Sequence, residues 1–113
     1  MQDALQILET DSPRNDVRII RLIGPCTINE LFKFQDALRY DSLHSTILDV
    51  SEVPYMDSAT LGCVIRLHVS SEQRNLKYAI VGASGRINAL FKATLVESVL
   101  IQYPTVEAAL AAL

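Results

Sequence analysis

The pair Asp57-Ser58 stands at the predicted start of a helix, where a serine hydroxyl could act as a nucleophile or accept a phosphate group. A nucleophilic serine needs a base within hydrogen-bond reach, and the sequence has two histidines, His44 and His68. His68 lies on the same predicted helix, about 15 Å further along it, and His44 precedes a strand at the opposite end of the predicted sheet. The Gly-x-Ser-x-Gly motif of serine hydrolases is missing. We therefore expect no enzymatic activity, and on the local sequence alone Asp57 is an ordinary N-cap and Ser58 an ordinary first-turn residue.

The sequence predicts neither a metal site nor a cofactor. Two histidines so far apart do not form a zinc site. The segment Gly82-Ala83-Ser84-Gly85 is too short for a dinucleotide or P-loop motif and is more typical of a turn followed by a helix cap. Cys26 and Cys63 form no Cys-x-x-Cys pair. We interpret them as small buried hydrophobic residues, with a redox-sensitive pair as the alternative.

The composition favours one domain that spans residues 1–113. Half of the residues are hydrophobic, which is enough for a core without disulfide bonds. Charged residues make up 20% and the net charge is −3, so neither a nucleic-acid footprint nor a polybasic membrane anchor is expected. The first residues lack the basic start of a signal peptide, and no apolar run is long enough to span a bilayer. With few cysteines, the predicted location is the cytoplasm.

Strand and helix patterns alternate along the chain and predict an α/β fold. It has a mixed four- to five-stranded sheet, an N-terminal hairpin and about four packed helices. Thr27 and Glu30 have the spacing of a capping box, and Asp57, Ser84 and Thr105 are further predicted caps. The predicted strands are 4–9, 17–23, 45–50, 78–81 and 99–101, and the predicted helices are 28–40, 58–73, 85–93 and a last one after Thr105.

Functional residues of such sheets lie beyond the carboxyl ends of the strands, where the helices begin. Here those places are residues 24–28, 51–58 and 82–85. The predicted buried face of the helix 58–73 consists of Leu61, Val64, Ile65 and Val69.

The stretch Asp57-Ser58-Ala59-Thr60-Leu61-Gly62, which follows a buried strand and a short loop, resembles the signature of the STAS domain family, named for sulphate transporters and anti-sigma antagonists. That signature is Asp-Ser-x-Gly-Leu-Gly at the start of a helix. The resemblance extends over nearly the whole chain in the order and length of its elements. It implies a STAS-like fold and a role as an anti-sigma factor antagonist.

The resemblance also implies a regulatory cycle. The serine that matches Ser58 is phosphorylated by an anti-sigma factor with serine kinase activity, and a serine phosphatase restores it. The unphosphorylated protein binds the anti-sigma factor and frees the sigma factor. A weak homodimer is a further expectation. The residues expected to bind the partner are Thr27, Asp57, Ser58, Ala59, Thr60 and Gly62.

Two positions depart from the family pattern. Thr60 stands where the signature has glycine, and we expect it to place a methyl and a hydroxyl group where a partner's backbone would approach. Thr27 stands where family antagonists usually carry an aspartate near the phosphoserine. Both departures leave room for a divergent kinase.

Other STAS domains offer an alternative function. They serve as scaffold subunits of stressosomes or as adaptor subunits of ABC-type lipid-transport complexes. Phe32 and Tyr40 would be interface residues in any of these roles if they point outward, or would widen the core if they do not.

Overall fold

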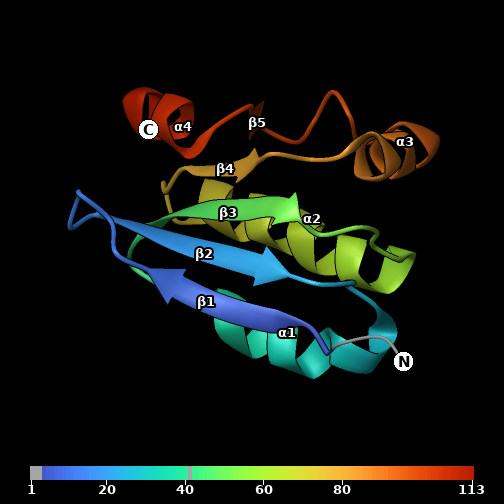
Figure 1. Cartoon of the computed structure of the whole chain (residues 1–113). Coiled ribbons are helices and arrows are strands. Elements are labelled where there is room, and N and C mark those ends of the chain that lie inside the picture. Colours follow the sequence, from blue (N-terminus) through green and yellow to red (C-terminus); the bar gives the residue numbers. More distant parts are fainter. Residues whose placement is uncertain (1–3, 41) are drawn as a thin grey trace.

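Five strands form one mixed sheet in the order β1-β2-β3-β4-β5, as seen in the computed structural model of the chain (Figure 1). The structure describes residues 4–40 and 42–113. The start of the chain, where we looked for a signal peptide, lies outside these residues. Strand β1 is antiparallel to β2, and the other neighbours are parallel. The predicted sheet and its hairpin are confirmed. The strands are β1 Gln6–Thr10, β2 Val17–Ile23, β3 Ser45–Glu52, β4 Tyr78–Val81 and β5 Gln102–Tyr103.

The connections between neighbouring parallel strands explain where the helices lie. Right-handed crossovers between strands that follow one another in the sheet place every connecting helix on the same face. The larger core cluster accordingly joins this face to the first three α-helices, and a smaller cluster joins the other face to the last one. The helices are the 3₁₀ helix η1 Ile28–Glu30, α1 Leu31–Leu38, α2 Ser58–Gln73, α3 Gly85–Ala93 and α4 Val106–Ala112.

Three predicted caps are confirmed because each side chain accepts a hydrogen bond from a main-chain N–H in the first turn of its helix. Asp57 begins α2, Ser84 begins α3 and Thr105 begins α4. Asn75 follows the end of α2, and its φ of 57° is the left-handed conformation that follows many helix ends. These are local signals, and the local sequence is sufficient to predict them.

Other predicted boundaries are wrong. The helix expected from residue 28 begins as the 3₁₀ helix η1, and α1 starts only at Leu31. The last strand is Gln102–Tyr103 instead of 99–101. On α2 the side chain of Val69 is exposed, and Leu67 takes its expected place in the core.

Two arginines hold the C-terminal ends of helices near the amino ends of the parallel strands. Arg18 on β2 is buried, and its Nε donates a hydrogen bond to the Thr46 hydroxyl at 2.8 Å. Its terminal nitrogens donate to the main-chain oxygens of Ala37, Leu38 and Arg39 at the end of α1. The buried guanidinium thus satisfies carbonyl groups that the helix itself leaves without a donor.

Arg14, in the turn between β1 and β2, has a similar role at the surface. It donates to the main-chain oxygens of Leu110 and Leu113 at the end of α4. Its other nitrogens bind the Asp16 carboxylate, and the pair is 2.7 Å apart. The Arg14 hydrogen bond holds the pKa of Asp16 below its usual value.

Candidate functional site

The carboxyl ends of β2 and β3 lead into two loops that run side by side. The Cys26 N–H donates to the Tyr55 oxygen at 3.1 Å, and the Asp57 N–H donates to the Cys26 oxygen at 3.0 Å. Cys26 and Met56 therefore form a parallel bridge beyond the end of the sheet. Figure 1 shows the first turn of α2, the carboxyl end of β3 and helix α3 on the right-hand side of the molecule.

The Asp57 carboxylate joins the two loops because its oxygens accept bonds from different elements. Oδ1 accepts from the Thr60 N–H at 3.0 Å, which caps α2, and Oδ2 accepts from the Ile28 N–H at 2.7 Å. Partial burial works to raise the pKa of Asp57, but the Thr60 and Ile28 hydrogen bonds outweigh it and hold that pKa below its usual value. The carboxylate is therefore charged at neutral pH and fixed in place.

Thr60 lies inside the site, and the expectation that its side chain would face a partner is wrong. Its side chain is fully buried. The hydroxyl lies 2.8 Å from the Cys26 oxygen and 3.0 Å from Asp57 Oδ1. The first turn of α2 packs against the loop that carries Cys26, and this packing covers Thr60.

Thr27 is the N-cap of η1, but its side chain makes no capping hydrogen bond. The predicted capping box with Glu30 is therefore wrong. The Glu30 N–H instead donates to the main-chain oxygen of Thr27 at 2.9 Å, and the neighbouring Ile28 N–H is bound by Asp57. The Glu30 N–H that the Thr27 hydroxyl would have bound is thus taken by a main-chain oxygen of the 3₁₀ turn. Thr27 is partly exposed and lies between Cys26 and Ile28, beside the start of α2.

Ser58 is the first residue of α2, and its side chain is exposed. Ala59 is partly exposed, and Gly62 is exposed one turn further along the same helix. A Cβ atom built on Gly62 would have no other atom within 4 Å. The structure thus brings together Thr27, Asp57, Ser58, Ala59 and Gly62, and leaves open space over the first turns of α2.

Two large apolar side chains are exposed on the neighbouring element. Ile28 on η1 is 63% exposed, and Phe32 on α1 is 79% exposed. They are four residues apart, so they lie on the same side of this segment. Phe32 was predicted to be an interface residue if its side chain points outward, and in the structure it does. Ile28 was missed, because its place beside Ser58 depends on the Asp57 hydrogen bond.

Tyr40 was the other conditional interface residue, and it is only partly exposed. Its hydroxyl donates to the Cys63 oxygen at 3.1 Å, and the Arg66 guanidinium lies 4.3 Å from the centre of its ring. Burial raises its pKa above the usual value. Tyr40 therefore works mainly to join α1 to α2.

Helix α3 borders the site on its other side. Gly82, before this helix, has a φ of 77°, and a Cβ there would lie 2.7 Å from the Ser51 Cβ. Only glycine fits this approach of the β4 end to β3. The Arg86 guanidinium in the first turn of α3 lies 5.1 Å from the Tyr55 ring, three residues before Ser58. A cation therefore stands at the edge of the loop that delivers the serine.

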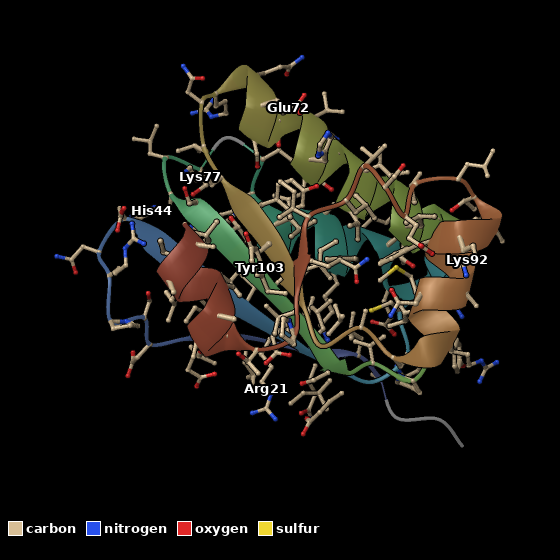
Figure 2. The ribbon with its side chains drawn as sticks, turned by 90° about the horizontal axis from the view of Figure 1, so that it is seen from above. Arg21, His44, Glu72, Lys77, Lys92 and Tyr103 are labelled. Atoms are coloured by element: carbon tan, nitrogen blue, oxygen red, sulfur yellow. The ribbon has the colours of Figure 1, made fainter. Side chains whose placement is uncertain are left out.

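Both histidines lie away from Ser58. His68 binds the Tyr78 hydroxyl through Nδ1 at 2.7 Å, and its Nε2 lies 3.2 Å from Glu72. His44 lies at the end of the molecule opposite Lys92 of α3 (Figure 2). Neither is placed to activate the serine.

The two cysteines are free thiols, and both are buried. Burial raises the pKa of Cys26 to about 12, and the nearby Asp57 charge adds to this effect. The thiol is therefore protonated at neutral pH. Among residues 4–40 and 42–113, no three His, Cys, Asp or Glu side chains are arranged to hold a metal ion, and no helix is long and apolar enough to cross a bilayer.

Solved structures with similar folds include two that are described as anti-sigma factor antagonists and one that is described as a cell fate determinant of Bacillus. One from Mycobacterium paratuberculosis is 19% identical, with a TM-score of 0.79 over 96% of this chain and 93% of that one. The phosphorylated Bacillus cell fate determinant SpoIIAA is 18% identical, with a TM-score of 0.64 over 96% and 97%. A STAS domain from Rhodobacter sphaeroides is 18% identical, with a TM-score of 0.61 over 74% and 95%.

No curated protein sequence matches the chain. At these identities the structural likenesses show the fold alone. The model of the STAS domain family, however, matches residues 10–109. This match covers all of the sheet except part of β1, together with the whole of the Ser58 region. The chain therefore belongs to the STAS domain family.

Proposed function

We propose that this protein is an anti-sigma factor antagonist controlled by phosphorylation of Ser58. In its unphosphorylated form it binds an anti-sigma factor with serine kinase activity in the cytoplasm, and a serine phosphatase reverses the modification. Residues 1–113 act as one domain, and the protein itself is not an enzyme. The observation that supports this most is the exposed Ser58 hydroxyl at the first residue of α2, on a surface framed by Asp57, Ile28 and Phe32.

The fold would tolerate a phosphate at this position. The first N–H groups of a helix lack partners inside it, and the helix dipole is positive there. The Thr60 N–H is already bound by Asp57, while the exposed Ser58 side chain points away from the core. We therefore expect phosphorylation to leave the structure unchanged.

A bound partner would sense the same phosphate strongly. It adds about −1.5 to −2 charges beside the Asp57 carboxylate. An acidic group of the partner about 4 Å away would be repelled by roughly 4 kcal/mol per pair of unit charges near a protein surface. Because about 1.4 kcal/mol is tenfold in affinity, one phosphate can control binding without refolding.

The test is mass spectrometry of the intact protein after incubation with the anti-sigma kinase and ATP. Wild type should gain one phosphate, and Ser58→Ala should gain none. Ser84→Ala is the matched control, because Ser84 also begins a helix at this edge of the sheet, and it should be modified like wild type. Equal modification of Ser58→Ala would disprove the site.

A measurement of partner binding before and after this incubation separates the regulatory role from the scaffold or adaptor role. A protein that binds its partner stably but is not phosphorylated under any of these conditions would be an adaptor, as in stressosomes or lipid-transport complexes. A protein that loses its partner when Ser58 is phosphorylated is a switch.

A further inference from the structure

The Thr60 hydroxyl stands between the two loops of the candidate site. It is fully buried and faces three oxygen atoms: the Cys26 oxygen at 2.8 Å, Asp57 Oδ1 at 3.0 Å and the Asp57 main-chain oxygen at 3.1 Å. A hydroxyl has one proton to donate. Whichever acceptor it takes, the hydroxyl binds either the loop of β2 or the start of α2 and lies in contact with the other.

The remaining hydrogen bonds around Thr60 join the same two segments. Its own N–H donates to Asp57 Oδ1, and the Ile28 N–H donates to Oδ2 of the same carboxylate. The Asp57 N–H donates a hydrogen bond to the Cys26 oxygen. The carboxylate, the hydroxyl and the Cys26 carbonyl therefore link residues 26–28 to the first turn of α2.

We propose that Thr60 is a positioning residue that fixes the loop of Ile28 to the start of α2, so that Ile28 and Ser58 are presented to a partner as one rigid surface. This inference rests on the proposed function for the identity of the partner, but the linkage itself does not. A glycine, which the STAS signature has at this position, would supply neither the hydroxyl nor the methyl group.

The charges around Asp57 support this role. The Cys26 thiol lies close enough to Asp57 for the carboxylate charge to raise the pKa of that thiol, and this thiol carries no positive charge. The carboxylate is stabilised by hydrogen bonds from Thr60, Ile28 and Ala59. Removal of the hydroxyl therefore weakens the hold on the carboxylate, and through Oδ2 the hold on Ile28.

The test compares Thr60→Val, which has nearly the same shape without the hydroxyl, with Thr60→Ser, which keeps the hydroxyl. The first measurement is amide hydrogen exchange by NMR, without any partner. In Thr60→Val we expect the Ile28 N–H to exchange about tenfold faster and the pKa of Asp57 to rise. Thr60→Ser should restore both. Thr94→Val is the control, because the Thr94 hydroxyl bonds to a main-chain oxygen on α3, away from this loop.

The second measurement is the affinity of each unphosphorylated variant for the partner, at a temperature where all variants are folded. Thr60→Val should bind about tenfold more weakly, and Thr60→Ser should bind like wild type. Unchanged Ile28 exchange in Thr60→Val, or unchanged affinity despite faster exchange, would overturn the proposal. If wild type itself does not bind an anti-sigma factor, the proposed function fails, and the exchange measurement alone then decides whether Thr60 holds the loop.

Discussion

At both ends of the sheet, side chains bind the main-chain groups that helix ends leave without partners, but the side chains differ. At the amino ends of the parallel strands, helices finish and expose carbonyl groups, and the long side chains of Arg18 and Arg14 supply donors for them. At the carboxyl ends, helices begin and expose N–H groups, and the short side chains of Asp57 and Ser84 accept from them. In both places a side chain completes a helix terminus.

The difference lies in what remains at the surface. A guanidinium with several donors can reach many carbonyls at once, and Arg18 is buried in doing so. A short cap satisfies one or two N–H groups and leaves the next residue, such as Ser58, exposed. The first end is therefore suited to hold the fold, and the second is suited to present a group that can be modified without loss of stability.

Replacement of Arg18 should have the largest effect. Arg18→Met removes the N–H groups that donate to the Thr46 hydroxyl and to the carbonyls at the end of α1. Because these acceptors would stay buried without partners, the free energy of unfolding should fall by about 3 kcal/mol. Urea denaturation measures this. Arg14→Met, at a more exposed helix end, should cost only about 1 kcal/mol. Folded Arg18→Met should bind the partner with wild-type affinity. A loss of affinity in this variant would contradict the assignment of stability to one end of the sheet and of binding to the other.

A charge at position 58 should have the opposite effect, because it should lower partner affinity and leave the free energy of unfolding nearly unchanged. Ser58→Asp should weaken partner binding at least about tenfold, while the free energy of unfolding changes by less than about 0.5 kcal/mol, because an acidic residue is favourable in the first turn of a helix. Calorimetry and urea denaturation give the two values. Ser84→Asp keeps a good cap and adds a charge at the same edge. If it weakens binding equally, the effect belongs to charge in general and not to Ser58.

Removal of the Asp57 cap should lower stability by about 1 kcal/mol in Asp57→Ala. Because the pKa of Asp57 is lower in the folded protein than its usual value of 3.8, its contribution is complete above that value and is lost as the pH falls through the folded pKa. Urea denaturation between about pH 6 and pH 2 should show the wild-type advantage shrinking in this range. Ser84→Ala, which removes an uncharged cap, should lose a similar amount at every pH.

Gly62→Ala should have the smallest effect, and it should be stabilising. Alanine favours a helix over glycine by up to about 1 kcal/mol, and the new methyl group has open space around it. Thermal unfolding should therefore shift slightly upward. Gly85→Ala, in equally open space on α3, is the control for binding. A loss of affinity in Gly62→Ala alone would show that a partner approaches the helix closely there.

The parts of the site that could be predicted depend on neighbours in the sequence. Asp57 and Ser84 are caps because their acceptors reach N–H groups three residues away, and Ser58 follows from the position of Asp57. The capping box of Thr27 failed because the Glu30 N–H donates to the Thr27 main-chain oxygen. The bond from the Ile28 N–H to Asp57, about thirty residues later in the chain, is another contact that local sequence does not predict. The burial of Thr60 likewise depends on the loop of Cys26, which no local pattern reveals.

The strand order also has a consequence for folding. Because each strand pairs with the strand that precedes it in the chain, the sheet can grow by addition of one strand at a time, and no pairing has to wait for a distant segment. Contacts between sequence neighbours shorten the loops that must close and favour faster folding. The Ser58 surface belongs to the unit β2-α1-β3-α2. Because these elements follow one another in the chain, this surface is built from consecutive segments.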